Sequence, residues 1–198
     1  MTEKTLEIDK GKERDEVKKL LDEVIAKQSD KIPPQALPLI KETFTKIFAD
    51  HLSPKEAMGL TPEVMEVFYQ QGYLFFQSGK FKEALQMFDF LRLLDVKDKR
   101  YTFAIAACYQ YMKEYLNAAA NYILYKTVDP FNPIPSFHLY DCFMGAHYPE
   151  TALYYLEEAR ILTEEDPRYA GLKNKIELEL GIAKDLLKNR YQEKFGNG

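Results

Sequence analysis

Apolar residues recur along most of the chain at the three- and four-residue spacing of amphipathic helices. The first such run ends before the prolines at 33 and 34 and carries five apolar residues at this spacing: Val17, Leu20, Leu21, Val24 and Ile25. A second run places five further apolar residues on one helix face: Leu37, Ile40, Phe44, Ile47 and Phe48. The pattern therefore predicts two helices in the first quarter of the chain.

Helix-start signals follow these two runs. Ser53 precedes Pro54 and stands three residues before Glu56, which is the pattern of a capping box with proline at the first helical position. Thr61 before Pro62 predicts the start of a further helix. At the other end, residues 168–194 form a long charged stretch with regularly spaced leucines and isoleucines. We expect this stretch to be a helix that caps the preceding structure.

A period of 34 residues runs through the middle of the chain. Ala84, Ala118 and Ala152 are 34 residues apart, and a bulky apolar residue follows each of them by four positions: Phe88, Tyr122 and Leu156. Aromatic residues recur at the same period, namely Phe75, Tyr109 and Phe143. A fixed period of this length indicates a stack of similar supersecondary units.

This pattern resembles the tetratricopeptide repeat, in which each unit is a pair of helices. We place three repeats at residues 65–98, 99–132 and 133–166, with short turns beginning at Gly79, Lys113 and His147. The predicted fold is all-α: a three-repeat superhelix, since no unit can bury its apolar face alone. Residues 1–33 are predicted as an extension with one helix, 34–64 as further N-terminal helices, and 167–198 as the capping helix and tail.

Composition narrows the function classes. The formal net charge is −4, so no overall positive field attracts phosphates, and nucleic acid is not an expected partner. The sequence lacks a secretory signal and any run of about 18 apolar residues, which predicts a cytoplasmic protein without membrane insertion. Two cysteines are too few for a disulfide framework, in agreement with a reducing compartment.

No motif for catalysis emerges, and we expect a non-enzymatic protein without cofactor or metal. Glycine-rich phosphate loops and the Gly-x-Ser-x-Gly elbow are missing from the sequence. His138, Cys142 and His147 could together bind zinc. The alternative is that Cys142 is a core residue, because it occupies the same repeat position as Cys108 and Leu74. Equivalent positions in stacked helices are about 10 Å apart, so both thiols are expected to be free.

The first helix of each tetratricopeptide repeat lines a concave groove with its second, fifth, ninth, twelfth and thirteenth residues. The candidate peptide-binding residues at these positions are Tyr69, Tyr73, Phe76, Phe103, Ala107, Gln110, Tyr111, Ile134 and Phe137. The remaining positions are Glu66, Gln77, Arg100, Asp141, Met144 and Gly145. Such an aromatic surface either forms apolar pockets for an extended peptide or packs against the N-terminal helices or a neighbouring copy.

Several segments resemble a narrower family. They are residues 77–84 (QSGKFKEA), 94–101, 106–108 with Met112, and 135–138 (PSFH). Together they are similar to the class II chaperones of bacterial type III secretion, the chaperones for translocator proteins, over roughly residues 44–162.

The resemblance implies a cytoplasmic bacterial chaperone that keeps hydrophobic translocator proteins stable and competent for secretion without nucleotide. Family members bind an extended Pro-x-Leu-x-x-Pro segment in the concave groove, and this assigns pockets to the candidate residues above. Several members also form homodimers, for which Phe44, Ile47 and Phe48 are the candidates here. The alternative function is a general tetratricopeptide scaffold that binds another protein or peptide.

Overall fold

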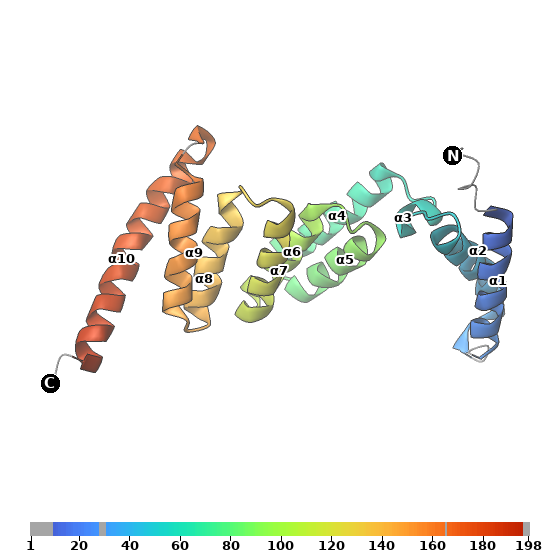
Figure 1. Cartoon of the computed structure of the whole chain (residues 1–198), viewed down its shortest axis with the longest axis horizontal. Helices are drawn as coiled ribbons and strands as arrows, with labels where there is room; N and C mark the ends of the chain where they lie inside the picture. Colours follow the sequence, from blue (N-terminus) through green and yellow to red (C-terminus); the bar gives the residue numbers. More distant parts are fainter. Residues whose placement is uncertain (1–9, 28–30, 165, 196–198) are drawn as a thin grey trace, which may run out of the picture. The chain divides into compact units, whose positions relative to one another are not determined.

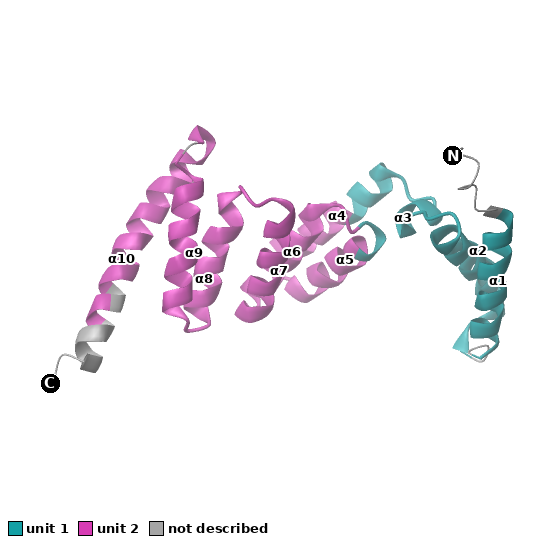
Figure 2. Ribbon diagram, in the orientation of Figure 1, with its two compact units in different colours: residues 1–68, 93–95 teal, residues 69–92, 96–198 magenta. Residues whose placement is uncertain are grey.

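The computed structural model describes residues 10–27, 31–164 and 166–195, and every regular element within these ranges is a helix (Figure 1). The expectation that the chain begins without a secretory signal concerns residues 1–9, which lie outside these ranges. The chain divides into two compact units, residues 1–68 with 93–95 and residues 69–92 with 96–198 (Figure 2). All nine candidate peptide-binding residues therefore lie in the second unit.

The first unit contains the N-terminal elements: α1 (Lys10–Ala26), η3 (Pro34–Ala36), α2 (Leu37–Phe48), α3 (Pro54–Ala57) and the first residues of α4 (Pro62–Gln77). Ion pairs connect α1 to α2 and the residues that follow it. Arg14 Nη1 lies 2.6 Å from a carboxylate oxygen of Asp50, and Lys41 pairs with Asp22. Because these charges are partly exposed, each pair contributes little to the free energy of unfolding.

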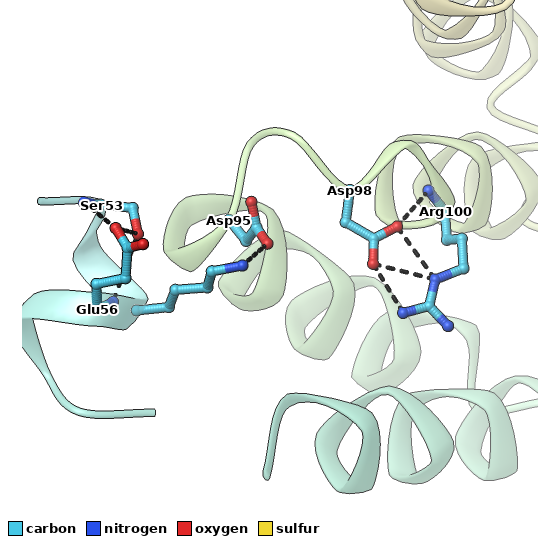
Figure 3. A network of polar contacts seen from close by, with 6 residues as sticks. Ser53, Glu56, Asp95, Asp98 and Arg100 are labelled. Carbon is cyan, nitrogen blue, oxygen red and sulfur yellow. Dashed lines mark hydrogen bonds and ion pairs between the residues drawn. The ribbon is translucent and has the colours of Figure 1, made fainter. Parts of the chain in front are cut away.

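The start of α3 is the capping box that the sequence predicts. The Ser53 backbone N–H donates to Glu56 Oε2 at 2.9 Å, and the Ser53 hydroxyl accepts from the Glu56 backbone N–H at 3.4 Å (Figure 3). These reciprocal bonds satisfy two backbone donors that would otherwise lack partners. Lys55 of the same helix pairs with Asp95.

The second unit contains three helix pairs and a long final helix. The elements are the rest of α4, α5 (Phe81–Leu94), α6 (Lys99–Tyr111), α7 (Tyr115–Val128), α8 (Pro133–Gly145), α9 (Pro149–Leu162), η4 (Pro167–Tyr169) and α10 (Ala170–Phe195). Helices α6 to α10 follow one another in chain order (Figure 1). Helices α6 and α8 begin at the first residues of the second and third predicted repeats, whereas α4 begins three residues before the first.

The same turn joins the two helices of every pair. Gly79, Lys113 and His147 are 34 residues apart and have φ angles of 74°, 62° and 66°. In each turn this residue donates its N–H to the carbonyl three residues back, and the next residue donates to the carbonyl five residues back, for example Lys80 to Phe75 at 2.9 Å. This is the Schellman arrangement, which usually contains glycine because other residues are strained at positive φ.

We expect Lys113→Gly to raise the free energy of unfolding by up to about 1 kcal/mol. Glycine relieves a strain of about 1–2 kcal/mol at positive φ, and part of this gain is offset by its larger entropy in the unfolded chain. Gly79→Ala introduces the same strain and should lower the free energy of unfolding by a similar amount. Urea denaturation of both variants checks the pair, and equal effects of the same sign would contradict it.

Small residues allow the helices of each pair to approach closely. Ala84, Ala118 and Ala152, the residues that define the 34-residue period, are all 0% exposed. At Gly72, a Cβ atom would lie 2.8 Å from the ring of Phe88. The repeat positions that carry small residues in the sequence are therefore the helix contacts of the structure.

The final helix covers the last pair. Ile176, Leu180 and Ala183 of α10 are buried in one cluster with residues of α8 and α9, among them Leu156. The Tyr140 hydroxyl donates to Glu179 Oε2 at 3.0 Å, and Lys184 Nζ lies 2.7 Å from Glu157. Helix α10 thus buries the apolar face that the third pair would otherwise expose.

Candidate peptide-binding surface

The nine predicted residues, which we call the first-helix surface, come from α4, α6 and α8. Two of them have well-exposed rings: Tyr73 is 45% and Tyr111 61% exposed. Six are half-buried, namely Tyr69, Phe76, Phe103, Ala107, Gln110 and Ile134. Phe137 is only 6% exposed. The surface therefore offers aromatic rings mainly from α4 and α6.

Three aromatic rings cluster where α4, α5 and α6 meet. The ring centre of Phe76 lies 5.0 Å from that of Tyr111 and 5.3 Å from that of Phe81. The rings of Phe81 and Tyr111 are 5.2 Å apart. This packing fixes the exposed Tyr111 ring in position, so that an apolar ligand meets a preformed platform. Phe81 was not predicted, because the sequence places it in a turn.

Tyr69 is held between neighbours on several sides. Its ring centre lies 5.6 Å from that of Phe88 and 5.9 Å from that of Tyr101. The guanidinium group of Arg100 lies 4.7 Å from the Tyr69 ring centre and pairs with Asp98 at 2.7 Å (Figure 3). Tyr69 thus contributes to packing within its repeat more than Tyr73 does.

Phe103 belongs to a second aromatic cluster, in which α6, α7 and α8 meet. Its ring makes edge contacts with Tyr122 and Tyr125, each at 5.3 Å, and with His138 at 5.6 Å. The imidazole of His138 stacks on Tyr122 with ring centres 5.0 Å apart. Burial, and then the nearby Lys175, lower the pKa of His138 to about 4, so the imidazole is neutral at physiological pH.

A row of polar side chains crosses the same three helices. The Tyr122 hydroxyl donates to Gln110 Oε1 at 2.8 Å, and Gln110 in turn hydrogen-bonds to the carboxylate of Asp141. Burial raises the pKa of Asp141, while Lys175 opposes that rise. Sequence reasoning placed Asp141 on the concave face without assigning it a role. Tyr122 was taken only as a packing residue.

Helix α10 covers the predicted third pocket. Phe137 is buried in the cluster that contains Ile176 and Leu180, and Lys175 Nζ lies 4.6 Å from its ring centre. By repeat position Phe137 corresponds to Phe103, which is half-buried. The two differ because no fourth repeat follows α9 and α10 packs there instead. In this structure Phe137 is not accessible to a ligand.

Comparisons with known proteins agree with this arrangement. No family model matches the chain. The low calcium response locus protein H of Yersinia pseudotuberculosis is 26% identical over 117 residues, which span 59% of this chain and 70% of that protein.

Two chaperones of known structure resemble the chain in both fold and sequence. SycD of Yersinia enterocolitica, a type III secretion chaperone solved with a peptide of the translocator YopD, is 27% identical with a TM-score of 0.60, covering 66% of this chain and 98% of SycD. SycD was also solved as an alternative dimer. PcrH of Pseudomonas aeruginosa, solved with the chaperone binding region of PopD, is 27% identical with a TM-score of 0.61, covering 64% of this chain and 96% of PcrH.

The chain belongs to the class II chaperone family of type III secretion. The predicted all-α repeat fold is confirmed for this chaperone by its helix pairs and by these structural neighbours. Its relatives are chaperones, a non-catalytic family. Within the described ranges, none of the chaperone's helices combines the length and apolarity needed to cross a membrane.

The residues of the alternative zinc site are placed differently from one another. Cys142 is buried, and burial, followed by Asp141, raises the pKa of its thiol to about 12. His147 is exposed in the turn before α9. In the described part of the chaperone, no three His, Cys, Asp or Glu residues are grouped as metal ligands. Cys108 and Cys142 are both free and buried, whereas Leu74 at the equivalent position is 54% exposed, because no repeat precedes α4.

A cavity of about 750 Å³ lies away from the first-helix surface. It lies beside the turn between α7 and α8 and the segment after α9, and its lining includes Asp129, Phe131, Ile161 and Arg168. Its charged groups form pairs within the chaperone, such as Lys99 with Asp129 at 2.7 Å and Arg168 with Asp166 at 2.6 Å. The cavity therefore presents little uncompensated charge to a ligand.

The predicted dimerisation residues lie in the first unit on α2. Phe44 and Phe48 are 42% and 56% exposed, and their rings stack with centres 5.9 Å apart. Ile47 between them is half-buried. The structure thus places two of the three candidates together on an exposed apolar ridge of α2.

Proposed function

We propose that this chaperone binds hydrophobic translocator proteins of type III secretion in the bacterial cytoplasm, through an extended segment that lies on the first-helix surface. The observation that carries the proposal is the exposed aromatic platform of Tyr73 and Tyr111, supported from below by Phe76. It occurs in a chain whose relatives SycD and PcrH were solved with translocator segments. Binding of this kind keeps an aggregation-prone protein stable and secretion-competent without nucleotide.

The expected strength of binding fits a chaperone that must release its cargo. Three apolar anchors at about 1.5–3 kcal/mol each contribute roughly 5–9 kcal/mol, while association costs about 4 kcal/mol or more. The remainder corresponds to weak binding unless backbone hydrogen bonds or a wider interface add to it. A permanent subunit interface would need a larger buried area.

Titration with a short peptide tests the proposal. The probe contains Pro-x-Leu-x-x-Pro, and its control has both prolines and the leucine replaced by serine. We expect a dissociation constant on the order of micromolar or tighter for the probe and at least about tenfold weaker binding for the control. Equal binding of both peptides would overturn the proposal and leave a general repeat scaffold as the function.

The exposed ridge of α2 supports a homodimer of the chaperone. Phe44→Ser combined with Phe48→Ser removes two stacked rings, and we expect the variant to be monomeric in sedimentation velocity at concentrations at which the wild type is a dimer. Leu39→Ser is the matched control, because Leu39 is 69% exposed on the same helix but faces the opposite side at about 100° per residue. Loss of the dimer in the control alone would place the interface elsewhere on α2.

A further inference from the structure

Three side chains on three different helices form an ordered polar chain next to the aromatic platform. Because the Tyr122 hydroxyl donates to Gln110 Oε1 at 2.8 Å, the amide oxygen of Gln110 is occupied and its NH₂ group is the one that donates to Asp141. Tyr122 is 0% exposed and is clamped by Phe103 and His138. The orientation of Gln110, and with it that of Asp141, is therefore fixed before any ligand arrives.

Asp141 retains acceptor capacity. A carboxylate accepts about four hydrogen bonds, and Gln110 supplies one of them. In the described part of the chain, the buried side-chain atom that lacks a partner is His138 Nδ1. Each oxygen of Asp141 therefore either already accepts a hydrogen bond or is open to solvent.

The surroundings of Asp141 favour a donor. Burial makes its charged form less stable than in water, and Glu179 adds repulsion that Lys175 partly offsets. An additional hydrogen bond from a ligand would stabilise the carboxylate. A second anion on the ligand would not, which argues against a ligand that presents a carboxylate at this point.

An extended segment on an aromatic surface needs such an acceptor. Its backbone N–H groups lose water when the segment binds, and an unpaired buried N–H is strongly unfavourable. The first-helix surface is largely aromatic and aliphatic, and the Gln110 oxygen is already occupied by Tyr122. Asp141 lies on α8 next to Gln110, which itself is adjacent in sequence to the platform residue Tyr111.

We propose, on the basis of the proposed function, that Asp141 accepts a hydrogen bond from a backbone N–H of the bound segment and so fixes its position along the surface. Gln110 and Tyr122 are positioning residues that hold the carboxylate in place. The aromatic rings then supply affinity, and Asp141 determines which residue of the segment lies opposite α8.

N-methyl peptides test this hydrogen bond directly. The probe contains Pro-Ala-Leu-Ala-Ala-Pro without Lys or Arg, and each non-proline amide of the probe is methylated in turn. We expect one N-methyl group to weaken binding to the wild type about tenfold or more, as for a hydrogen bond to a charged group, but to weaken binding to Asp141→Ala by less than about twofold. Asp141→Asn keeps an acceptor oxygen and should retain part of this coupling.

The outcomes separate the two proposals. Selective binding of the probe, with the same N-methyl losses in wild type and Asp141→Ala, would overturn the hydrogen bond and leave the proposed function intact. Absence of selective binding would overturn both. Tyr122→Phe should reduce the coupling by releasing Gln110, whereas Tyr125→Phe, which loses a hydroxyl bonded to Asp129 at 3.2 Å, should leave it unchanged.

Discussion

Ala118→Glu is expected to unfold the helix pairs of the second unit. Ala118 is 0% exposed and packs in one cluster with Ala106, Tyr122 and Leu139. A glutamate at this position forces a carboxylate without a partner between α6, α7 and α8. Burial of an unpaired charge costs several kcal/mol, which is a large fraction of the roughly 5–15 kcal/mol that stabilises a typical domain.

The control for this variant lies on the same helix. Ala120 is exposed on α7, so Ala120→Glu should change the free energy of unfolding by about 0.5 kcal/mol or less. Urea denaturation followed by far-ultraviolet circular dichroism distinguishes the two variants. A cooperative transition of Ala118→Glu near that of the wild type would mean that α7 does not pack as described.

The helix pairs were predictable because they depend on local periodicity. The 34-residue spacing of Ala84, Ala118 and Ala152 gave the contact positions, and all three are fully buried. The capping box at Ser53 followed from the order of three residues in the sequence. Such features require no knowledge of distant neighbours, since the pattern of side chains already specifies which face is buried.

The details of the surface depend on contacts that periodicity does not contain. The repeat pattern treats Phe103 and Phe137 alike, but α10 buries Phe137 because it occupies the place of a following repeat. Tyr69 and Tyr73 also belong to one pattern, yet Arg100, Phe88 and Tyr101 surround the first of them.

The polar chain from Tyr122 to Asp141 was likewise hidden from the sequence. It joins side chains on three helices, and its order depends on which atom of Gln110 accepts the hydroxyl hydrogen. Repeat arithmetic assigned Gln110 and Asp141 to neighbouring positions on successive first helices. That much indicated proximity, while the direction of the hydrogen bonds required atomic positions.

The largest expected effect on binding comes from the aromatic platform. Tyr73→Ala combined with Tyr111→Ala removes the two exposed rings of the first-helix surface. We expect a loss of about 2–4 kcal/mol in the binding free energy of the Pro-x-Leu-x-x-Pro probe, or roughly 30- to 700-fold in the dissociation constant. Since both rings are largely exposed, helical content should stay the same. Isothermal titration calorimetry and circular dichroism on one preparation measure both quantities.

Two other exposed tyrosines provide the matched control. Tyr148 and Tyr154 are 51% and 64% exposed and lie at the start of α9 and within it, away from the first helices. Their joint replacement by alanine removes a similar aromatic area and should leave binding within about twofold of the wild type. Equal losses in both double variants would show that general hydrophobicity binds the probe. A loss confined to Tyr73 and Tyr111 would instead locate binding on α4 and α6, where the rings of Phe76 and Phe81 hold the platform rigid.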